Sequence, residues 1–221
     1  MLWIFDVNET MLDLSPLDSV FAQHLGTPNA RRDWFNLLVR SALVATATGQ
    51  YRDFAQLGAD CARTVAQGFD VQLPPAAVEQ LGTTMRRLPA HVDVPDALAA
   101  LRAAGHRLVV LANSPQAVVE TQLAYAGLTG LLDQVYSAEH AETLKPGRAA
   151  YQFVLEREGR QPDDAVMVAA HDWDIAGAQA AGMHTVFVAR PGHTLLPTWP
   201  DPDAVVVDFC SLDALVLRRV S

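Results

Sequence analysis

Polar side chains that could carry out chemistry stand at the ends of several apolar segments in this 221-residue chain. They are Asp6, Asn8 and Thr10 at the end of 2–6, Asn113 after 107–112, Lys145 in LKPGRAAY, and His171, Trp173 and Asp174 after 165–170. Ligands of open parallel sheets bind beyond the carboxyl ends of strands, so we expect these groups to share one sheet edge. A carboxylate beside an ammonium group and an imidazole could support covalent catalysis, with the carboxylate as nucleophile.

Short apolar segments alternate with helical patterns along most of the chain. The segments are mostly apolar throughout, as expected for strands that are covered on both faces. We expect strands at 2–6, 107–112, 134–137, 165–170, 184–189 and 204–207, and helices at 95–104, 115–126 and 148–158. This order predicts an α/β fold, in which a parallel sheet carries helices on both faces.

The alternation of strands and helices is absent from the segment 15–87, which has helical periodicity and no convincing strand. Ser15 and Pro16 are typical of a helix start, with a capping hydroxyl and a proline at the first helical position. Further signals predict helices within 31–47 and 53–67, helix ends at Gly26, Gly49 and Gly68, and a helix start at Pro74 and Pro75. We therefore predict a helical cap at 15–87, inserted into a core of residues 1–14 and 88–221.

Composition and charge argue against several classes of protein. The formal net charge is −9 and basic residues occur at most in pairs, so we do not expect nucleic acid as a partner. No apolar run approaches the ~20 residues of a membrane span, and no signal-type start precedes Asp6. We expect each of the two cysteines, Cys61 and Cys210, to be a small buried apolar residue. So few cysteines favour a protein of the reducing cytoplasm over a secreted, disulfide-bonded one.

The order of these motifs resembles that of the haloacid dehalogenase superfamily over nearly the whole chain. The segments FDVNETMLDL, VVLANSPQ, LKPGRAAY and MVAAHDWDIAGAQAAG are similar to its four motifs. The pattern looks most like the type II (L-2-)haloacid dehalogenases; the residues that carry this likeness are Lys145, Pro146, Tyr151, Trp173 and Asp174, with Trp34, Tyr51 and Phe54 in the insert. The resemblance implies a Rossmann-like core, a helical cap and an aspartate nucleophile, and it is compatible with a homodimer formed through the cap.

The resemblance also implies roles for individual residues. Asp6 would displace halide from the carbon of a small halocarboxylate, forming an ester that water then hydrolyses. Lys145 would keep Asp6 ionised, while Thr10 and Asn113 would orient it by hydrogen bonds. Asp174 would pair with Lys145 and position the water, for which His171 is a candidate base. Contacts to substrate are expected from Asn8, Asn113, Phe35, Trp173 and Tyr151, and no metal ion or cofactor is expected.

The residue two positions after Asp6 argues against a phosphatase. Phosphatases of the superfamily carry an acid there, which protonates the leaving alkoxide, and Asn8 cannot act as an acid. Their metal-binding acid in the fourth motif is replaced by Ala169 and Ala170, which cannot hold Mg²⁺. Halide leaves without a proton, so the sequence favours a metal-independent dehalogenase. A phosphatase of the superfamily and a catalytically weak ligand-binding protein on this fold are the alternatives.

Several substrate-contact positions depart from the type II pattern. Phe35 stands at the place of the cap arginine, Ala112 replaces a hydroxyl residue, and His171 replaces an asparagine. Arg40 lies ~140° away from Phe35 around the helix, at ~100° per residue, and is a poor substitute for the missing cation. Arg52, in the following turn, is the other candidate. These departures predict a hydrolase whose substrate differs from the usual short 2-haloacid.

Overall fold

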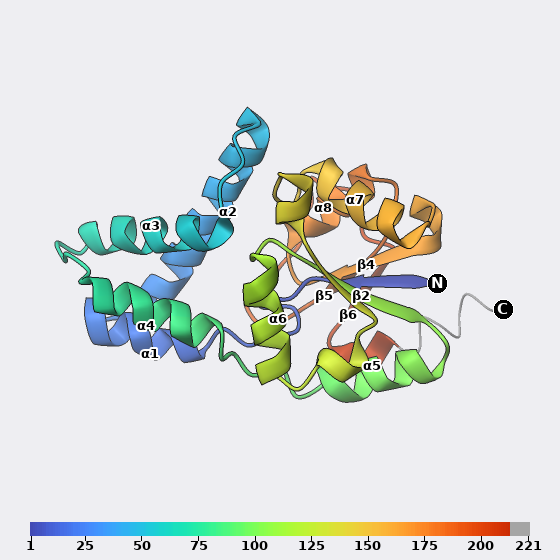
Figure 1. Cartoon of the computed structure of the whole chain (residues 1–221), viewed down its shortest axis with the longest axis horizontal. Helices are drawn as coiled ribbons and strands as arrows, with labels where there is room; N and C mark the ends of the chain where they lie inside the picture. The colour runs from blue at the N-terminus through green and yellow to red at the C-terminus, as the bar shows by residue number, and fades with distance from the viewer. Residues whose placement is uncertain (213–221) are drawn as a thin grey trace.

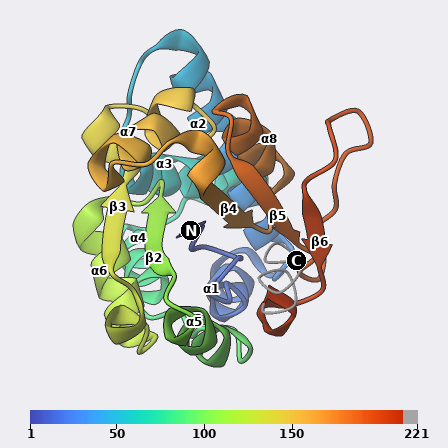
Figure 2. The same cartoon turned by 90° about the vertical axis from the view of Figure 1, so that its right-hand side faces the viewer.

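The computed structural model describes residues 1–212, and a parallel sheet lies at the centre of the core (Figures 1 and 2). Its strand order is β3-β2-β1-β4-β5-β6, and each neighbouring pair is parallel. The strands are β1 (Leu2–Phe5), β2 (Arg107–Ala112), β3 (Gln134–Ser137), β4 (Ala165–Ala169), β5 (His184–Val188) and β6 (Ala204–Val206). Every predicted strand is confirmed, with ends that differ by no more than one residue.

Helices cover both faces of the sheet (Figure 2). The core helices are α5 (Val94–Ala103), α6 (Gln116–Tyr125), α7 (Arg148–Glu158) and α8 (Asp172–Ala180), with short 3-10 helices η1 (Thr129–Leu131), η2 (Ala138–Ala141), η3 (Pro162–Asp164) and η4 (Phe209–Leu212). Trp3 and Phe5 belong to the hydrophobic cluster that includes α5 and α6, while Ile4 belongs to the cluster of α7 and α8. Burial on both sides explains why successive strand residues are apolar.

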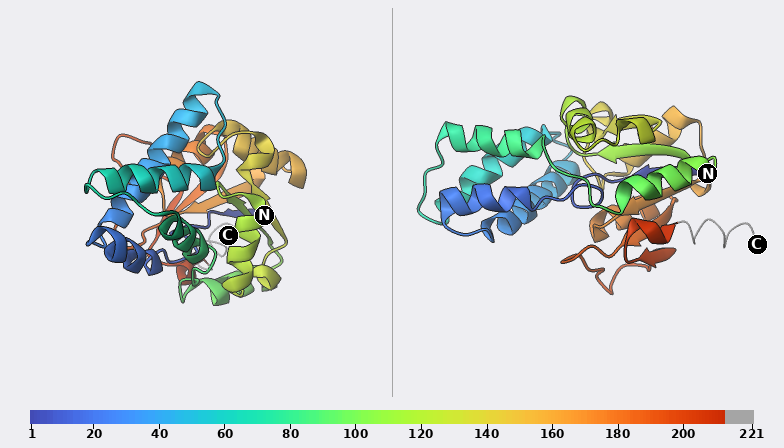
Figure 3. Two further views of the ribbon diagram at one scale, coloured as in Figure 1. Left: turned by 60° about the vertical axis from the view of Figure 1, so that its left-hand side comes forward. Right: turned by 90° about the horizontal axis from the view of Figure 1, so that it is seen from below.

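Four helices form a layer beside the core, as the cap prediction requires (Figures 1 and 3). They are α1 (Pro16–Leu25), α2 (Ala30–Thr48), α3 (Phe54–Gln67) and α4 (Pro75–Met85). Helix α2 packs on α1 and α3, and α1 packs on α4. Helices α1 and α2 end at Gly26 and Gly49, whose φ angles of 75° and 65° are in the left-handed region that glycine adopts most readily. Residues 15–87 contain no strand.

The two segments that connect the cap to the core run side by side. Asp13 N–H donates a hydrogen bond to Pro89 O at 2.9 Å, and Leu12 forms an isolated antiparallel bridge with Ala90. The predicted boundaries, after residue 14 and before residue 88, lie next to these two connecting segments. The division of the chain into a core and a cap with these boundaries stays a prediction. Residues 213–221, which were assigned to the core, lie outside the described residues.

Two local predictions are wrong. Helix α1 starts at Pro16, but the Ser15 hydroxyl does not cap it, because this hydroxyl donates to Asp13 Oδ2 at 2.6 Å. Cys61 is buried, whereas Cys210 is exposed, since η4 presents it to solvent at the edge of the core. Within residues 1–212, no helix is long and apolar enough to cross a membrane.

Candidate active site

The candidate nucleophile Asp6 follows the central strand β1 directly. Asp6 N–H donates to Val168 O at 3.0 Å, which continues the pairing of β1 with β4 and fixes the backbone at the strand end. The chain then turns sharply, because the N–H groups of Met11 and Leu12 both donate to Val7 O, at 2.9 and 3.0 Å. This turn brings Asp6 and Thr10 together beneath the cap.

Lys145 connects two buried carboxylates. Its Nζ lies 2.8 Å from Asp6 Oδ1 and 2.7 Å from Asp174 Oδ2, and it donates a third hydrogen bond to Leu111 O at 2.8 Å. Burial alone would lower the pKa of Lys145, but the charges of Asp174 and Asp6 outweigh it and raise the pKa. The lysine is therefore a fixed cation with all three donors engaged.

The second oxygen of Asp6 is held from the opposite side. Thr10 Oγ1 donates to Asp6 Oδ2 at 2.7 Å and itself accepts from Ala170 N–H at 2.9 Å. His171 Nδ1 lies 3.1 Å from the same oxygen. Burial would raise the pKa of Asp6, but the charge of Lys145 and the hydrogen bond from His171 hold this pKa well below its usual range. Asp6 is thus a carboxylate at neutral pH.

Arg190 stabilises the turn after β1 by hydrogen bonds to the main chain of Thr10. Its Nε and Nη2 donate to Thr10 O at 3.1 and 3.0 Å, and its Nη1 pairs with both Asp93 oxygens at 2.9 and 2.8 Å. Asp93 also accepts from Phe209 N–H at 2.7 Å. The position of Thr10, and through it that of Asp6, is therefore fixed by the side chains of Arg190 and Asp93 and the main chain of Phe209, which come from three separate segments of the core.

Tyr151 lies behind Asp174 rather than in a pocket. Its hydroxyl donates to Asp174 Oδ1 at 2.6 Å, and the side chain is fully buried. Helix α8 approaches so closely that a Cβ at Gly177 would lie 2.5 Å from the Tyr151 oxygen. Burial and the charge of Asp174 raise the pKa of Tyr151 well above its usual value. In place of the expected substrate contact, the structure gives Tyr151 a supporting position.

Asn113 contacts Lys145 and has no hydrogen bond to Asp6 among the described interactions, contrary to the expectation. Lys145 N–H donates to Asn113 Oδ1 at 2.7 Å, and Asn113 Nδ2 donates to Lys145 O at 3.3 Å. Because both contacts are to main-chain atoms, Asn113 positions the lysine loop. Its effect on Asp6 is indirect.

Asn8 forms hydrogen bonds with two neighbouring side chains. Its Nδ2 donates to Ser114 Oγ at 3.3 Å, and its Oδ1 accepts from Gln122 Nε2 at 3.1 Å. Pro115 occupies the N-cap position of α6, and no side-chain cap is present there. Asn8 is 8% exposed, so its amide is largely enclosed beside Asp6.

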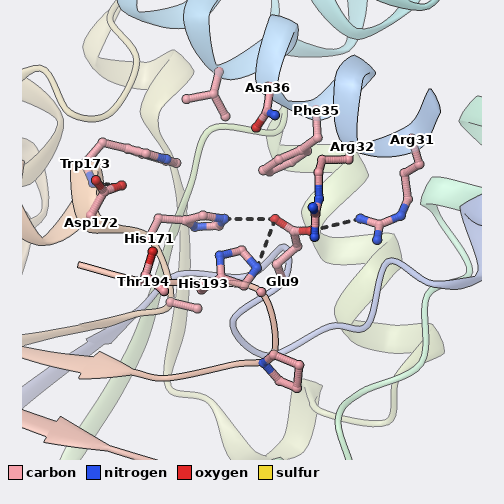
Figure 4. A pocket seen from close by; sticks show the side chains of 14 residues that line it. Glu9, Arg31, Arg32, Phe35, Asn36, His171, Asp172, Trp173, His193 and Thr194 are labelled. Atoms are coloured by element: carbon pink, nitrogen blue, oxygen red, sulfur yellow. Dashed lines mark hydrogen bonds and ion pairs between the residues drawn. The ribbon is translucent and has the colours of Figure 1, made fainter. Parts of the chain in front are cut away.

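A pocket of about 360 Å³ opens between helix α2 and the loops after β4 and β5 (Figure 4). Asp6 does not line it, but His171, which contacts Asp6, does. His171 lies in it between two aromatic rings, with centroid distances of 5.6 Å to Phe35 and 5.0 Å to Trp173. Burial would lower the pKa of His171, but the hydrogen bonds to Asp6 and Glu9 outweigh it and raise this pKa to about 9. Phe35 and Trp173 line the pocket, and their contact with a substrate stays a prediction.

Glu9 is a functional candidate that the sequence analysis missed. Its Oε2 lies 3.2 Å from His171 Nε2 and 3.5 Å from His193 Nε2, while its Oε1 accepts from Arg31 Nη1 at 3.0 Å (Figure 4). Ligand atoms of Glu9, His171 and His193 converge within 4.8 Å, so these residues could hold a cation. No local signal connects Glu9 with His193, because they lie 184 positions apart in the sequence.

Arg32 is the second candidate that was missed. It lines the pocket from helix α2, whereas Arg40 and Arg52 line a separate hollow on the surface. Arg32 precedes Phe35 by three residues, which at ~100° per residue places the two side chains ~60° apart on one helix face. This helical periodicity is the sequence signal that could have identified Arg32. Arg31 is engaged by Glu9 and Asp18, so Arg32 is the freer cation at the pocket.

Comparison with known proteins defines the class. The chain belongs to the haloacid dehalogenase-like hydrolase family, which matches residues 3–188. It is 28% identical over 189 residues to (S)-2-haloacid dehalogenase 1 of Pseudomonas sp. (strain CBS-3), covering 85% of this chain and 83% of that protein. Haloacetate dehalogenase H-2 of Moraxella sp. (strain B) is 25% identical over 207 residues, which are 91% of each protein. L-2-haloacid dehalogenase from Xanthobacter autotrophicus with chloropropionic acid covalently bound has a TM-score of 0.91 and 20% identity, covering 98% of this chain and 99% of that one.

Proposed function

We propose that this protein is a hydrolase that releases halide from a haloacid through an ester formed on Asp6. The observation that carries the proposal is the buried pair of Asp6 and Lys145 at the end of β1, with Asn8 in place of a second acid. Relatives named as haloacid and haloacetate dehalogenases support this chemistry, and so does the fold shared with an enzyme that carries covalently bound chloropropionic acid.

The first step is displacement at carbon. An oxygen of Asp6 attacks the carbon that bears the halogen, a C–O bond forms, and the halide leaves with the electron pair of the C–X bond. Lys145 and Thr10 hold the carboxylate in one orientation for this attack. The halide is a weak base and needs no proton or metal ion to leave. Asn8, whose amide can donate a hydrogen bond but cannot act as an acid, is therefore compatible with this step.

The second step is hydrolysis of the ester by water. Asp174 is enclosed, because its oxygens already accept from Lys145 and Tyr151 and its side chain has no exposed surface. His171 borders the pocket through which water enters. Ester formation removes the charge of Asp6, one of the two carboxylates that raise the pKa of His171, so we assign the base to this residue. Water adds to the ester carbonyl carbon, which releases the hydroxyacid and restores Asp6.

Arg32 is the group that we assign to the substrate carboxylate. It lines the pocket one helical turn before Phe35, and an arginine guanidinium matches a carboxylate with two parallel hydrogen bonds. The loop after β5 approaches this guanidinium closely at Gly192, where a Cβ would lie 3.4 Å from Arg32 Nη2 and where φ is 87°. The pocket volume of about 360 Å³ exceeds that of a three-carbon acid, so we propose a larger haloacid as substrate.

The test is halide release without added metal from a panel of chloro-, bromo- and fluorocarboxylates of increasing size. Wild type should release halide, and Asp6→Asn should lower the rate by at least about 10³-fold, because the nucleophile is lost. Asp163→Asn, which changes an exposed aspartate of η3, should leave the rate unchanged. Magnesium-dependent turnover of p-nitrophenyl phosphate, or haloacid turnover that persists in Asp6→Asn, would overturn the proposal.

We further propose a cytoplasmic protein with a small-molecule substrate and no nucleic-acid partner. The thiols of Cys61 and Cys210 are unpaired, which suits a reducing compartment, and the net charge of −9 disfavours phosphate backbones. A homodimer through the cap is part of the proposal, since Leu43 and Val44 of α2 expose apolar surface that a second copy could cover. Light scattering of the purified chain would measure its mass in solution.

A further inference from the structure

We propose that Glu9, His171 and His193 form a binding site for a divalent d-block cation of the Zn²⁺ class on the wall of the pocket. The three residues come from the turn after β1, the end of β4 and the loop after β5. Each offers one ligand atom, and these atoms lie within 4.8 Å of one another. The site differs from the Mg²⁺ position of the superfamily's phosphatases, where this chain has Ala169 and Ala170.

The separations of the ligand atoms suit tetrahedral coordination. With Zn–N bonds of about 2.0–2.1 Å, neighbouring ligand atoms of a tetrahedral site lie ~3.3 Å apart. Glu9 Oε2 lies 3.2 Å from His171 Nε2 and 3.5 Å from His193 Nε2. The His193 side chain is 20% exposed, so a small rotation could bring its nitrogen closer to His171. Three protein ligands leave a fourth coordination position, and all three residues line the pocket.

The orientation of His171 supports metal binding. Its Nε2 points toward Glu9 while its Nδ1 lies 3.1 Å from Asp6 Oδ2. Metal-bound histidines usually donate the N–H of their other ring nitrogen to a carboxylate or carbonyl, which fixes the ring. Here Asp6 supplies that carboxylate. A cation at Nε2 would therefore be linked to the nucleophile through a single imidazole ring.

The backbone of Glu9 is held in an unusual conformation. Its φ is 62°, a left-handed value that few residues other than glycine adopt. The conformation is fixed by a hydrogen bond from Glu9 N–H to Leu12 O at 2.9 Å and by a contact of His91 Nε2 with Glu9 O at 3.3 Å. Such strain concentrates at functional sites. The carboxylate of Glu9 faces both histidines (Figure 4).

The charge and donor types select the ligand. A carboxylate at the centre of the cluster repels an anion, and Arg31 engages only Oε1 of Glu9, which leaves Oε2 for a cation. Arg32 opposes the cation, but it is exposed and can turn toward solvent. Two imidazoles with one carboxylate suit Zn²⁺, Co²⁺, Ni²⁺ or Cu²⁺, whereas Mg²⁺ and Ca²⁺ prefer oxygen ligands.

The experiment is a titration of the tag-free, chelator-treated whole protein with Zn²⁺ by calorimetry and with Co²⁺ by visible absorption. We expect one cation per chain and Co²⁺ bands typical of low coordination number. Glu9→Gln and His193→Gln should each weaken binding by about 10–100-fold or more. His193 lies on a surface loop, so its variant should keep the wild-type circular dichroism. His184→Gln is the matched control, because His184 contacts one carboxylate, that of Asp203, at 3.1 Å.

Two results would overturn the proposal. One is the lack of stoichiometric binding of either cation at micromolar concentration. The other is binding that Glu9→Gln and His193→Gln leave unchanged, or that His184→Gln weakens as much as they do. The measurement uses no substrate, so its failure is distinguishable from a failure of the proposed dehalogenation.

Discussion

The Tyr151 hydroxyl donates a 2.6 Å hydrogen bond to Asp174 Oδ1 from a position with no exposed surface. The other oxygen of Asp174 accepts from Lys145 at 2.7 Å, and Lys145 donates to Asp6 at 2.8 Å. A chain of hydrogen bonds thus runs from the packed interface of α7 and α8 to the carboxylate of Asp6. A change at Tyr151 can act on Asp6 without touching the substrate.

Replacing Tyr151 with phenylalanine should lower both stability and kcat. The substitution removes one hydrogen bond from a buried carboxylate, at a cost of about 1–3 kcal/mol in the free energy of unfolding. Because Tyr151 does not line the pocket, KM should stay close to the wild-type value. Urea unfolding and steady-state kinetics would measure the two effects.

Tyr136→Phe is the matched control for this variant. Tyr136 donates a 2.7 Å hydrogen bond to Glu158, but this carboxylate also pairs with Arg107 near the surface. Both oxygens of Glu158 keep a hydrogen bond from Arg107 when the hydroxyl is lost, so the loss of stability should stay below about 1 kcal/mol. A large rise in KM for Tyr151→Phe would contradict its position behind Asp174.

Replacing Arg32 with alanine should weaken substrate binding. If Arg32 receives the substrate carboxylate, the loss of a charged hydrogen bond should raise KM by about 10–100-fold, with a smaller effect on kcat. Arg40→Ala provides the control on the same helix, because Arg40 lines a different hollow. Equal KM values for the two variants would exclude Arg32 as the carboxylate ligand.

The stability contributed by Asp93 should depend on pH. Burial would raise the pKa of Asp93, but the hydrogen bonds from Arg190 and from Phe209 N–H outweigh it and lower the pKa below 3.8. Since the folded-state pKa is depressed, this stability is present above about pH 4, the ordinary value for aspartate, and is lost as pH falls through the folded-state pKa.

Urea unfolding of wild type and Asp93→Asn between pH 7 and pH 2.5 would measure this dependence. The wild type should be more stable at pH 7, and the difference in the free energy of unfolding should shrink below about pH 4. A difference that stays constant over this range would contradict a depressed pKa of Asp93. Comparison with the variant cancels the titration of the other carboxylates.

The sequence by itself determined the architecture and the central ionic groups. Apolar segments without alternation identified the four central strands, β1, β2, β4 and β5, because a strand covered on both faces needs apolar side chains at successive positions. The ends of those segments located Asp6 and Asp174, and the loop before a proline located Lys145. Helical periodicity between residues 15 and 87 identified the cap.

The tertiary structure alone decided which of these side chains meet. Tyr151 and Asn113 were expected at the substrate and at Asp6, but the close approach of α8 encloses Tyr151 and the lysine loop engages Asn113. Arg32 was missed because its position depends on how α2 lies over the core. Glu9 and His193 were missed because a hydrogen-bonded turn and a distant loop bring them together. Local patterns specify where strands and helices form, whereas convergence of distant loops depends on the packing of the whole chain.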